Sequence, residues 1–366
     1  MAKLGEVCLL KAGKFVSAND ISPEYNKGLY PCFGGNGIRG YVADYTHDGE
    51  FPLIGRQGAL CGNVNLASGK FHATEHAVVV QPKIEMNVHW LYYALNAMNL
   101  GQYATGAAQP GLAVSKLETL SIEIPNISEQ NKIAQTLYKV EQLVNFRKQQ
   151  LAKLDELIKA RFVEMFGEPS SNPMGWLQTT VGAECYYIKD GPHKSLTDVG
   201  MGNGYPFISV RNIVNGYIDF STAKYISEAD YKDAIKKCCP EKGDILYSKG
   251  GTTGIAKLVD IDIKFANWVH LAVLKFNHNE FNGSFFEKML NCDYCYKQSQ
   301  MLTKGIANRD LVLSAMAQIK IYKPPILLQN QFATFVERVD QQKQTVQQSL
   351  DKLELMKKAL MQEYFG

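Results

Sequence analysis

The sequence lacks the features that mark membrane and secreted proteins. It has no run of about 18 apolar residues, the length that a membrane-spanning helix needs. Its opening stretch, MAKLGEVCLL, lacks the long apolar core of a secretion signal. With 366 residues, 46% of them hydrophobic, the chain is long enough for two or three globular cores. We therefore expect a cytoplasmic protein of several domains.

Strong charge and a cysteine framework are missing as well. A net charge of +3 is too small to indicate nucleic-acid binding by itself, so a DNA-binding surface would need its basic residues gathered on one face. The eight cysteines are scattered, and in a reducing compartment most should be buried thiols. Cys292 and Cys295 form one CxxC motif, which Cys238 and Cys239 could complete as zinc ligands. Adjacent cysteines rarely bind one ion, so we expect no metal site.

Complete catalytic loops are also absent. Residues 33–37, FGGNG, fit the FxGxG loop that holds S-adenosylmethionine in DNA methyltransferases, and Pro31 and Cys32 fit the nucleophile dipeptide of cytosine methylases. Such a loop leaves a strand and opens a helix, whereas residues 38–42 have the alternation of a strand. The GGTTG at 250–254 lacks the Gly-Lys-Ser/Thr ending of a phosphate-binding loop. We therefore expect FGGNG to join two strands, and we expect no cofactor bound by this chain.

What the sequence does contain is a duplication. Residues 121–167 and 320–366 align without a gap at a constant offset of 199, with 17 of 47 positions identical. Chance would give about three identities, so the repeat is real. Among the identical pairs are Pro125 and Pro324, Gln130 and Gln329, and Asn131 and Asn330.

Each copy predicts a long helix with a coiled-coil seam. After its opening proline, each runs about 36 residues without glycine or proline, and its apolar residues recur in a 3-4 heptad rhythm. The expected seam residues are Leu137, Val140, Leu151, Leu154, Val339, Val346, Leu350 and Leu353. Basic residues interrupt the two seams at different layers, namely Arg147, Arg161, Lys343 and Lys357. We therefore expect the copies to pair with each other, antiparallel, within one chain. The alternative is that each apolar stripe packs only on its neighbouring domain.

The segments between the helices are distant copies of one another. LIGRQGALCGNV (53–64) echoes LYSKGGTTGIA (246–256), and Leu4–Cys8 echoes Val181–Cys185. Short β-branched and aromatic runs separated by turn residues predict mixed α/β domains. The expected fold class is α+β, or mixed, with two globular α/β domains separated by two long antiparallel coiled-coil helices in a pseudo-two-fold internal repeat. The expected boundaries are 1–125 and 168–324 for the globular domains, and 126–167 and 325–366 for the helices.

This arrangement resembles the specificity subunit of type I restriction-modification systems. The first half carries the resemblance in YPCFGGNGIRGYVADYTHDGE, LIGRQGALCGNV and TGAAQPGLAVSKLETLSIEIPNISEQNKIAQ. The second half carries it in YPFISVRNIVNGYID, KYISEADY, KGDILYSKGGTTGIAKLV and KGIANRDLVLSAMAQIKIYKPPILLQNQ. The short motifs are moderately specific, and the duplicated order of globule and helix is more so.

The resemblance implies a non-catalytic DNA reader. Each globular segment would be a target-recognition domain for one half of a bipartite site in double-stranded DNA, and the paired helices would act as a spacer that docks methyltransferase subunits, two in number. S-adenosylmethionine, ATP and Mg would be bound by the methyltransferase and by the restriction/translocase subunits. The resemblance implies no membrane partner.

Candidate DNA-contacting residues come from the loops of both globular segments. Arg, Lys, Asn, Gln and Thr side chains can read base edges, and glycines let the backbone approach phosphate. In the first segment the candidates are Asn36, Arg39, Arg56, Gln57 and Gln109; in the second they are Arg211, Asn212, Lys249, Thr252, Thr253, Asn308 and Arg309. Lys249 aligns with Arg56. For each residue the alternative is a solvated or ion-paired surface position.

The sequence leaves other interpretations open for two histidines and for the function of the chain. His76 and His270 precede apolar runs and are expected to be buried structural histidines rather than catalytic ones. The chain as a whole could instead be a self-sufficient DNA methyltransferase or nuclease, or a coiled-coil scaffold that binds only proteins. A methyl-transfer assay on the isolated chain, and the salt dependence of DNA binding, separate these alternatives.

Overall fold

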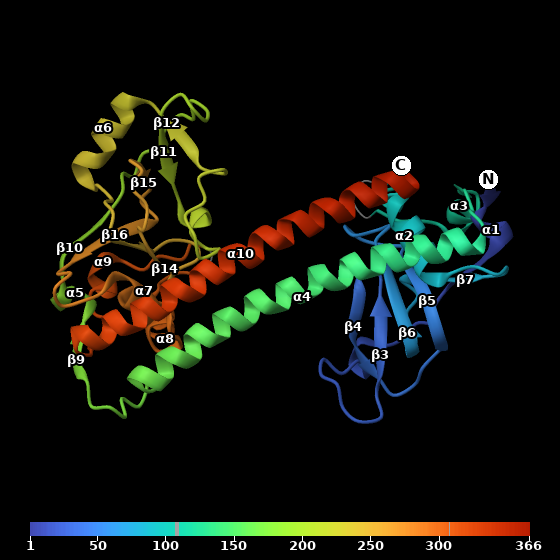
Figure 1. Cartoon of the computed structure of the whole chain (residues 1–366), viewed down its shortest axis with the longest axis horizontal. Coiled ribbons are helices and arrows are strands. Elements are labelled where there is room, and N and C mark those ends of the chain that lie inside the picture. Colours follow the sequence, from blue (N-terminus) through green and yellow to red (C-terminus); the bar gives the residue numbers. More distant parts are fainter. Residues whose placement is uncertain (107–109, 307) are drawn as a thin grey trace. The chain divides into compact units, whose positions relative to one another are not determined.

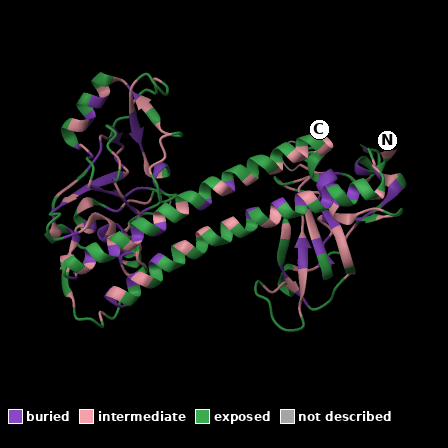
Figure 2. Ribbon diagram, in the orientation of Figure 1, coloured by how far each residue is buried: buried purple, intermediate pink, exposed green. Residues whose placement is uncertain are grey.

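The computed structural model describes residues 1–106, 110–306 and 308–366. The chain divides into two compact units. Unit 1 comprises Met1–Gln150 with Val346–Gly366, and unit 2 comprises Leu151–Thr345. Two helices of 40 residues each, α4 (Ile127–Phe166) and α10 (Ile326–Phe365), contribute one part to each unit. Within the units, buried residues gather in the sheets and on the helix faces that contact them, and the outer helix faces are exposed (Figure 2).

A six-stranded sheet forms the centre of unit 1 (Figure 1). Its order is β2-β7-β5-β6-β3-β4. All neighbours are antiparallel except β3 and β6, which run parallel. The strands are β2 (Cys8–Ala12), β3 (Tyr30–Gly34), β4 (Gly37–Val42), β5 (His47–Gly55), β6 (Val64–Ala73) and β7 (Ala77–Pro82). A small pair, β1 (Ala2–Lys3) and β8 (Ser121–Ile122), lies outside this sheet.

Helix α2 (Val88–Ala97) packs on β5 and β6 and closes the core of unit 1. Its apolar face supplies Trp90 and Leu91, both fully buried. The α4 residue Leu137 and the α10 residues Leu360 and Phe365 pack into the same core. Both long helices are thus anchored on unit 1 by side chains that their heptad rhythm places on one face. The shorter elements are α1 (Leu4–Val7), α3 (Val114–Glu118), η1 (Ala18–Asp20) and η2 (Leu100–Tyr103).

Unit 2 is built from smaller sheets. A four-stranded antiparallel sheet has the order β10-β16-β13-β14, a three-stranded sheet has the order β12-β11-β15, and β17 pairs with β9. The strands are β9 (Leu177–Thr180), β10 (Cys185–Asp190), β11 (Tyr205–Ile208), β12 (Lys224–Ile226), β13 (Ile245–Ser248), β14 (Ala256–Leu258), β15 (Ala266–Asn267), β16 (Leu271–Phe276) and β17 (Lys320–Lys323). The helical elements are α5 (Val181–Glu184), α6 (Glu228–Lys237), α7 (Gly283–Asn291), α8 (Asp293–Leu302), α9 (Leu313–Met316) and the turn η3 (Val210–Asn212).

An aromatic cluster joins the long helices to the globular part of unit 2. Phe162 and Phe166 of α4, Phe285 of α7 and Phe332 of α10 are all buried, and their ring centroids lie 4.7–6.5 Å apart. Several of these ring pairs meet edge to face, the geometry that aromatic quadrupoles favour. The cluster is the unit 2 counterpart of the core that buries Leu137 in unit 1.

The two globular parts repeat one strand order. In unit 1 the antiparallel succession is β2-β7-β5-β6, and in unit 2 it is β10-β16-β13-β14. Each part also contains one parallel pair of strands. This pair is β3 with β6 in unit 1, and β11 with the short strand β15 in unit 2. The sequence echo between Leu4–Cys8 and Val181–Cys185 corresponds to α1 and α5, each leading directly into a strand. The predicted duplication of the globular segments is therefore confirmed.

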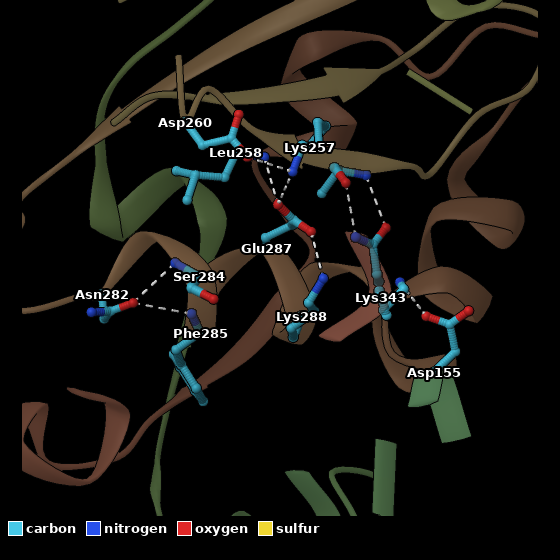
Figure 3. Close-up of polar contacts among 12 residues, drawn as sticks. Asp155, Lys257, Leu258, Asp260, Asn282, Ser284, Phe285, Glu287, Lys288 and Lys343 are labelled. Carbon is cyan, nitrogen blue, oxygen red and sulfur yellow. Dashed lines mark hydrogen bonds and ion pairs between the residues drawn. The ribbon is translucent and has the colours of Figure 1, made fainter. Parts of the chain in front are cut away.

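The two long helices pair antiparallel within each unit. In unit 1, Glu141 of α4 contacts Lys357 of α10 at 2.6 Å, and further along α4 the side chain of Arg147 donates to Ser349 at 3.1 Å. In unit 2, Asp155 contacts Lys343 at 2.6 Å (Figure 3). Residue numbers rise along one helix as they fall along the other, which confirms the predicted antiparallel pairing.

The seam accommodates its charges by pairing them across the helices. Lys343 and Lys357, which interrupt the apolar rhythm of α10, reach Asp155 and Glu141 on α4. Arg161, half-buried, lies with its guanidinium 5.8 Å from the ring centroid of Phe335. Of the predicted seam residues, Leu137, Val140, Val339, Val346 and Leu350 are buried, and Leu151, Leu154 and Leu353 are half-buried.

Candidate nucleic-acid interface

A hairpin turn supplies the first part of the candidate surface in unit 1. β3 ends at Gly34 and β4 begins at Gly37, so Gly35 and Asn36 form the turn between two antiparallel strands. Gly37 has φ +96°, in the region that favours glycine. The FGGNG segment thus joins two strands, as the sequence predicts, and does not open a helix. Exposed Asn36 accepts a hydrogen bond from the Asn63 amide at 2.9 Å.

A close backbone approach holds this turn against the end of β5. A Cβ atom on Gly55, the last residue of β5, would lie 1.9 Å from the carbonyl oxygen of Gly35. Only glycine permits that approach at position 55. The approach places the hairpin turn beside Arg56 and Gln57, which follow β5 directly. Residues about twenty positions apart in the sequence thereby meet in space.

Three sequence-predicted residues line one hollow as a result. This first-domain hollow has a volume of about 380 Å³ and is lined by Gly34, Gly35, Asn36, Arg39, Gln57, Gly58 and His76. Asn36, Arg39 and Gln57 are exposed, so their polar ends are available to a ligand. The glycines leave backbone groups accessible between them. Such a combination of amide, guanidinium and backbone groups suits the donors and acceptors of nucleic-acid edges and phosphates.

The hollow is basic in character. None of its lining residues is acidic, and Arg39 has no ion pair among the residues that the structure describes. The imidazole of His76 contacts one oxygen of the neighbouring Glu75 carboxylate at 3.2 Å, and the other Glu75 oxygen is buried without a hydrogen-bond partner in the described part of the chain. The charge that the lining itself offers to an acceptor-rich ligand is the Arg39 guanidinium.

Arg56 lies directly beside the hollow and is held through its backbone. Its N–H donates to the carbonyl of His76 at 3.0 Å, and its carbonyl accepts from Leu112 N–H at 2.9 Å. The side chain is half-buried, and its Nε is buried with no hydrogen-bond acceptor within the described part of the chain. Gln109, the fifth candidate of this domain, lies outside the described residues.

In unit 2, the neighbouring residues Arg211 and Asn212 differ in the exposure of their side chains. Arg211 is exposed and donates to the carbonyl of Thr222 at 2.9 Å. Asn212 is 1% exposed, and its side chain bonds Ser209, Asp219 and Thr222. Its side chain holds the η3 turn together from inside, and the DNA contact expected of Asn212 stays an untested prediction.

Lys249 and Thr253 are also interior residues. Lys249 is 6% exposed, and its ammonium group lies 3.0 Å from Asp310 and 3.5 Å from Asp190. Thr253 is 2% exposed and shares a hydrogen bond of 3.0 Å with Thr303. Burial and internal partners keep these two side chains off the surface in this structure, and the DNA contact expected of each stays an untested prediction.

The remaining candidates of unit 2 stay accessible to different degrees. Thr252 and Asn308 are exposed, while Arg309 is half-buried and donates to Thr253 and Gln300. These residues lie around the β-bridge between Gly250 and Asp310. The exposed candidates of unit 2 are thus Arg211, Thr252 and Asn308.

His76 is the site residue that sequence reasoning missed. The sequence predicts a buried structural histidine, but its side chain is 39% exposed and lines the hollow. His270, its counterpart by backbone pairing, is half-buried and packs edge to face on Trp268 with centroids 4.7 Å apart. The sequence signal that could have indicated exposure was position. Each histidine stands one residue before a strand rather than inside it.

Among the residues that the structure describes, no group of three or more His, Cys, Asp or Glu side chains is placed to hold a metal ion. Of the helices so described, none combines the length and apolar character that crossing a membrane requires. All eight cysteines are free, and five of them are buried: Cys8, Cys32, Cys185, Cys238 and Cys295.

Solved structures share this fold. The S subunit of the type I restriction-modification system from M. genitalium aligns over 100% of this chain and 95% of its own, with a TM-score of 0.66 and 19% identity. A chain from a structure of type I restriction-modification complex assembly aligns over 100% of this chain and 96% of its own, with a TM-score of 0.55 and 15% identity.

Curated relatives point the same way by sequence. The specificity subunit of the Escherichia coli type I restriction enzyme EcoprrI is 53% identical over 143 residues, which cover 39% of this chain and 36% of that protein. A putative type I restriction enzyme specificity subunit of Haemophilus influenzae is 25% identical over 343 residues, or 86% of this chain and 80% of that protein. The model of the type I restriction modification DNA specificity domain family matches residues 1–156 and again residues 188–355. The chain belongs to this family and carries its DNA specificity domain twice.

Proposed function

We propose that this chain is the DNA-reading subunit of a type I restriction-modification system, with each globular domain reading one half of a bipartite site in double-stranded DNA. The observation that carries the proposal is the repeated construction, in which one strand order and one specificity domain occur twice in a single chain. Two similar heads on one chain suit a target with two separate parts. The first-domain hollow supplies the contact surface of one head.

Catalysis belongs to partner subunits in this proposal. The one segment that resembles a methyltransferase cofactor loop is a hairpin turn between β3 and β4, and a cofactor loop needs the N-terminus of a helix behind it. S-adenosylmethionine would be bound by methyltransferase subunits, and ATP with Mg by restriction/translocase subunits. Two methyltransferase copies suit a chain whose helix and globular parts are duplicated.

The long helices serve as the spacer and as the docking surface. Each is continuous over 40 residues, or about 60 Å at 1.5 Å per residue, and paired helices are stiffer than any linker. On the part of α4 in unit 1, Tyr138, Leu143 and Phe146 are 44%, 45% and 60% exposed, although Leu137, Val140 and Val144 face the buried side. We assign this exposed apolar stripe, defined by Tyr138, Leu143 and Phe146, to a methyltransferase partner, because grouped exposed apolar side chains mark interaction surfaces.

The decisive experiment maps modified bases in host DNA with and without the gene. A bipartite methylated motif that disappears on deletion, and returns with the gene, supports the proposal. The same motif in both strains contradicts it. A methyl-transfer assay on the isolated chain with labelled S-adenosylmethionine tests the catalytic alternative, and turnover there would overturn the assignment of catalysis to partners.

A further inference from the structure

The two globular domains place a basic residue at one structurally equivalent position. Arg56 follows β5 directly and Lys249 follows β13 directly. The N–H of Arg56 donates to His76 O at 3.0 Å, and that of Lys249 donates to His270 O at 2.8 Å. The carbonyl of each accepts from a leucine N–H, Leu112 at 2.9 Å and Leu311 at 2.7 Å. The backbone geometry is therefore the same, and only the side chains and their surroundings differ.

The charge at this position is neutralised in the second domain. The ammonium group of Lys249 lies between Asp310, at 3.0 Å, and Asp190, at 3.5 Å. With 8% of its side chain exposed, Lys249 is committed to the two carboxylates. Removing an acidic partner from such a buried pair would leave a charge without compensation. Lys249 thus stabilises the fold and offers no charge to a ligand.

The first domain has no acid at either matching position. Gly111 forms a bridge with Thr105 as Asp310 does with Lys304, so Gly111 stands where the second domain has Asp310.

The other carboxylate is missing as well. Ala12 pairs with Val78 at the end of β2 as Asp190 pairs with Ala272 at the end of β10. Ala12 therefore stands where the second domain has Asp190. Among the ion pairs that join described residues, none involves Arg56. Arg56 directly precedes the hollow residue Gln57; its side chain is half-buried, and its Nε is buried without a hydrogen-bond partner in the described part of the chain.

We infer that Arg56 is a cationic DNA contact of the first domain, acting beside the hollow, and that its second-domain equivalent Lys249 is an internal ion-pair residue. The inference rests on the proposed function and deepens it, because it makes the two heads electrostatically unequal. The ligand of Arg56 is an acceptor atom of the first half-site, either a phosphate oxygen or the O6 and N7 edge of a guanine.

The sharpest test introduces into the first domain an acidic residue at the position that Asp310 occupies in the second domain. In Gly111→Asp, the carboxylate that neutralises Lys249 is placed beside Arg56. Among the described residues, a Cβ at Gly111 meets only the carbonyl oxygens of Arg56 and Thr105, at 3.9 Å, an ordinary van der Waals contact. Gly111→Asn has the same shape and no charge, and it is the matched control. Binding is measured by fluorescence anisotropy on the complex with its methyltransferase, using the mapped methylated motif and duplexes mutated in one half.

We expect Gly111→Asp to weaken binding about tenfold, and Gly111→Asn to change it much less. Arg56→Ala should weaken binding to a similar degree. In the Arg56→Ala background, Gly111→Asp should have little further effect, because its target is gone. Lys249→Ala should lower the melting temperature and leave the salt dependence of binding unchanged.

Salt and sequence dependence identify the acceptor. If Arg56→Ala lowers the slope of log affinity against log salt by about one on every duplex, the contact is a phosphate. If the loss appears only while one guanine of the first half-site is present, the contact is a base edge. Equal affinities for Gly111→Asp and Gly111→Asn, or unchanged binding by Arg56→Ala, would overturn the inference. A wild-type complex that does not distinguish the motif from other DNA would instead refute the proposed function.

Discussion

The side-chain oxygen of Gln130 accepts a hydrogen bond from the backbone N–H of Asn87 at 2.9 Å. Gln130 stands near the start of α4, and Asn87 caps α2 by accepting from Trp90 N–H. The second copy repeats the bond, with Gln329 accepting from Asn282 N–H at 2.9 Å. We call these two bonds the helix clamps. They explain why glutamine is identical in both copies, since each clamp fastens a long helix to a cap on its own globular domain.

Removing a helix clamp should destabilise the unit that contains it. In Gln329→Ala, the N–H of Asn282 and the carbonyl of Pro324 lose their partner in a fully buried position. The expected loss is about 1–3 kcal/mol in the free energy of unfolding. Thermal or urea unfolding measures it. Gln331→Ala, an exposed glutamine on the same helix, is the control, and an equal effect of both substitutions would contradict the role of the clamp.

A second prediction concerns the buried carboxylate of Glu287 on α7 (Figure 3). It accepts from Leu258 N–H at 2.8 Å and contacts Lys288 at 2.8 Å and Lys257 at 3.3 Å. Burial alone would raise the pKa of Glu287, but the two lysines outweigh it and hold the pKa below its ordinary value of 4.5.

The sign of the pH effect follows from that shift. Because the folded pKa is lowered, the stabilisation is present above the unfolded pKa and is lost as pH falls through the folded value. Glu287→Gln should therefore cost about 3 kcal/mol at pH 7 and flatten the acid side of the stability profile. Unfolding between pH 3 and 7 measures both effects, in about half-unit steps. Exposed Glu156→Gln is the control, and a parallel profile for the two variants would refute the prediction.

If the exposed apolar stripe on α4 binds a methyltransferase, a substitution there should disrupt the complex without destabilising the fold. Phe146→Asp places a charge on the exposed apolar stripe and should abolish co-purification with a methyltransferase while leaving the melting temperature nearly unchanged. Asn145→Asp adds the same charge at an exposed neighbouring position and should preserve the complex. Leu154→Asp should act through folding instead, because Leu154 packs against the core of unit 2. Survival of the Phe146→Asp complex would rule out this surface.

The first-domain hollow predicts a defect confined to one half-site. Arg39 is exposed there, and Arg39→Ala should weaken binding by about 1–3 kcal/mol if its guanidinium reads a guanine. Anisotropy on duplexes mutated in either half locates the loss. Lys139→Ala removes an exposed positive charge from α4, away from the hollow, and controls for net charge. Equal losses for Arg39→Ala and Lys139→Ala would show that only overall charge matters.

Much of the fold follows from local sequence signals. The heptad rhythm and the repeat at offset 199 predict α4, α10 and their antiparallel pairing, because these patterns depend only on spacing along the chain. The strand alternation after FGGNG predicts the β3–β4 hairpin for the same reason. The carboxylate partners of the seam lysines are less visible, because Glu141 and Lys357 are 216 positions apart.

The candidate site was harder to predict because burial and ion pairing are tertiary properties. Residue type and a glycine-rich neighbourhood select Arg56 and Lys249 equally. Asp310 is 61 positions from Lys249 and its effect appears only when the chain is folded. Asn212 looks like a surface amide in sequence, yet its hydrogen bonds close a turn from within. Loop position alone does not distinguish a side chain that faces a ligand from one that supports the loop.

The mixed seam of the helix pair also determines how a shortened chain would behave. At the offset of 199 between the two copies, Lys343 aligns with Val144, and Lys357 aligns with Ile158. A fragment ending after α4 that self-associated in the same register would set Asp155 against Val144 and Glu141 against Ile158, so both carboxylates would lose their counter-ions. The first half of the molecule is thus a poor match for a second copy of itself and a good match for its own second half, which favours an intact monomer over homodimers of fragments.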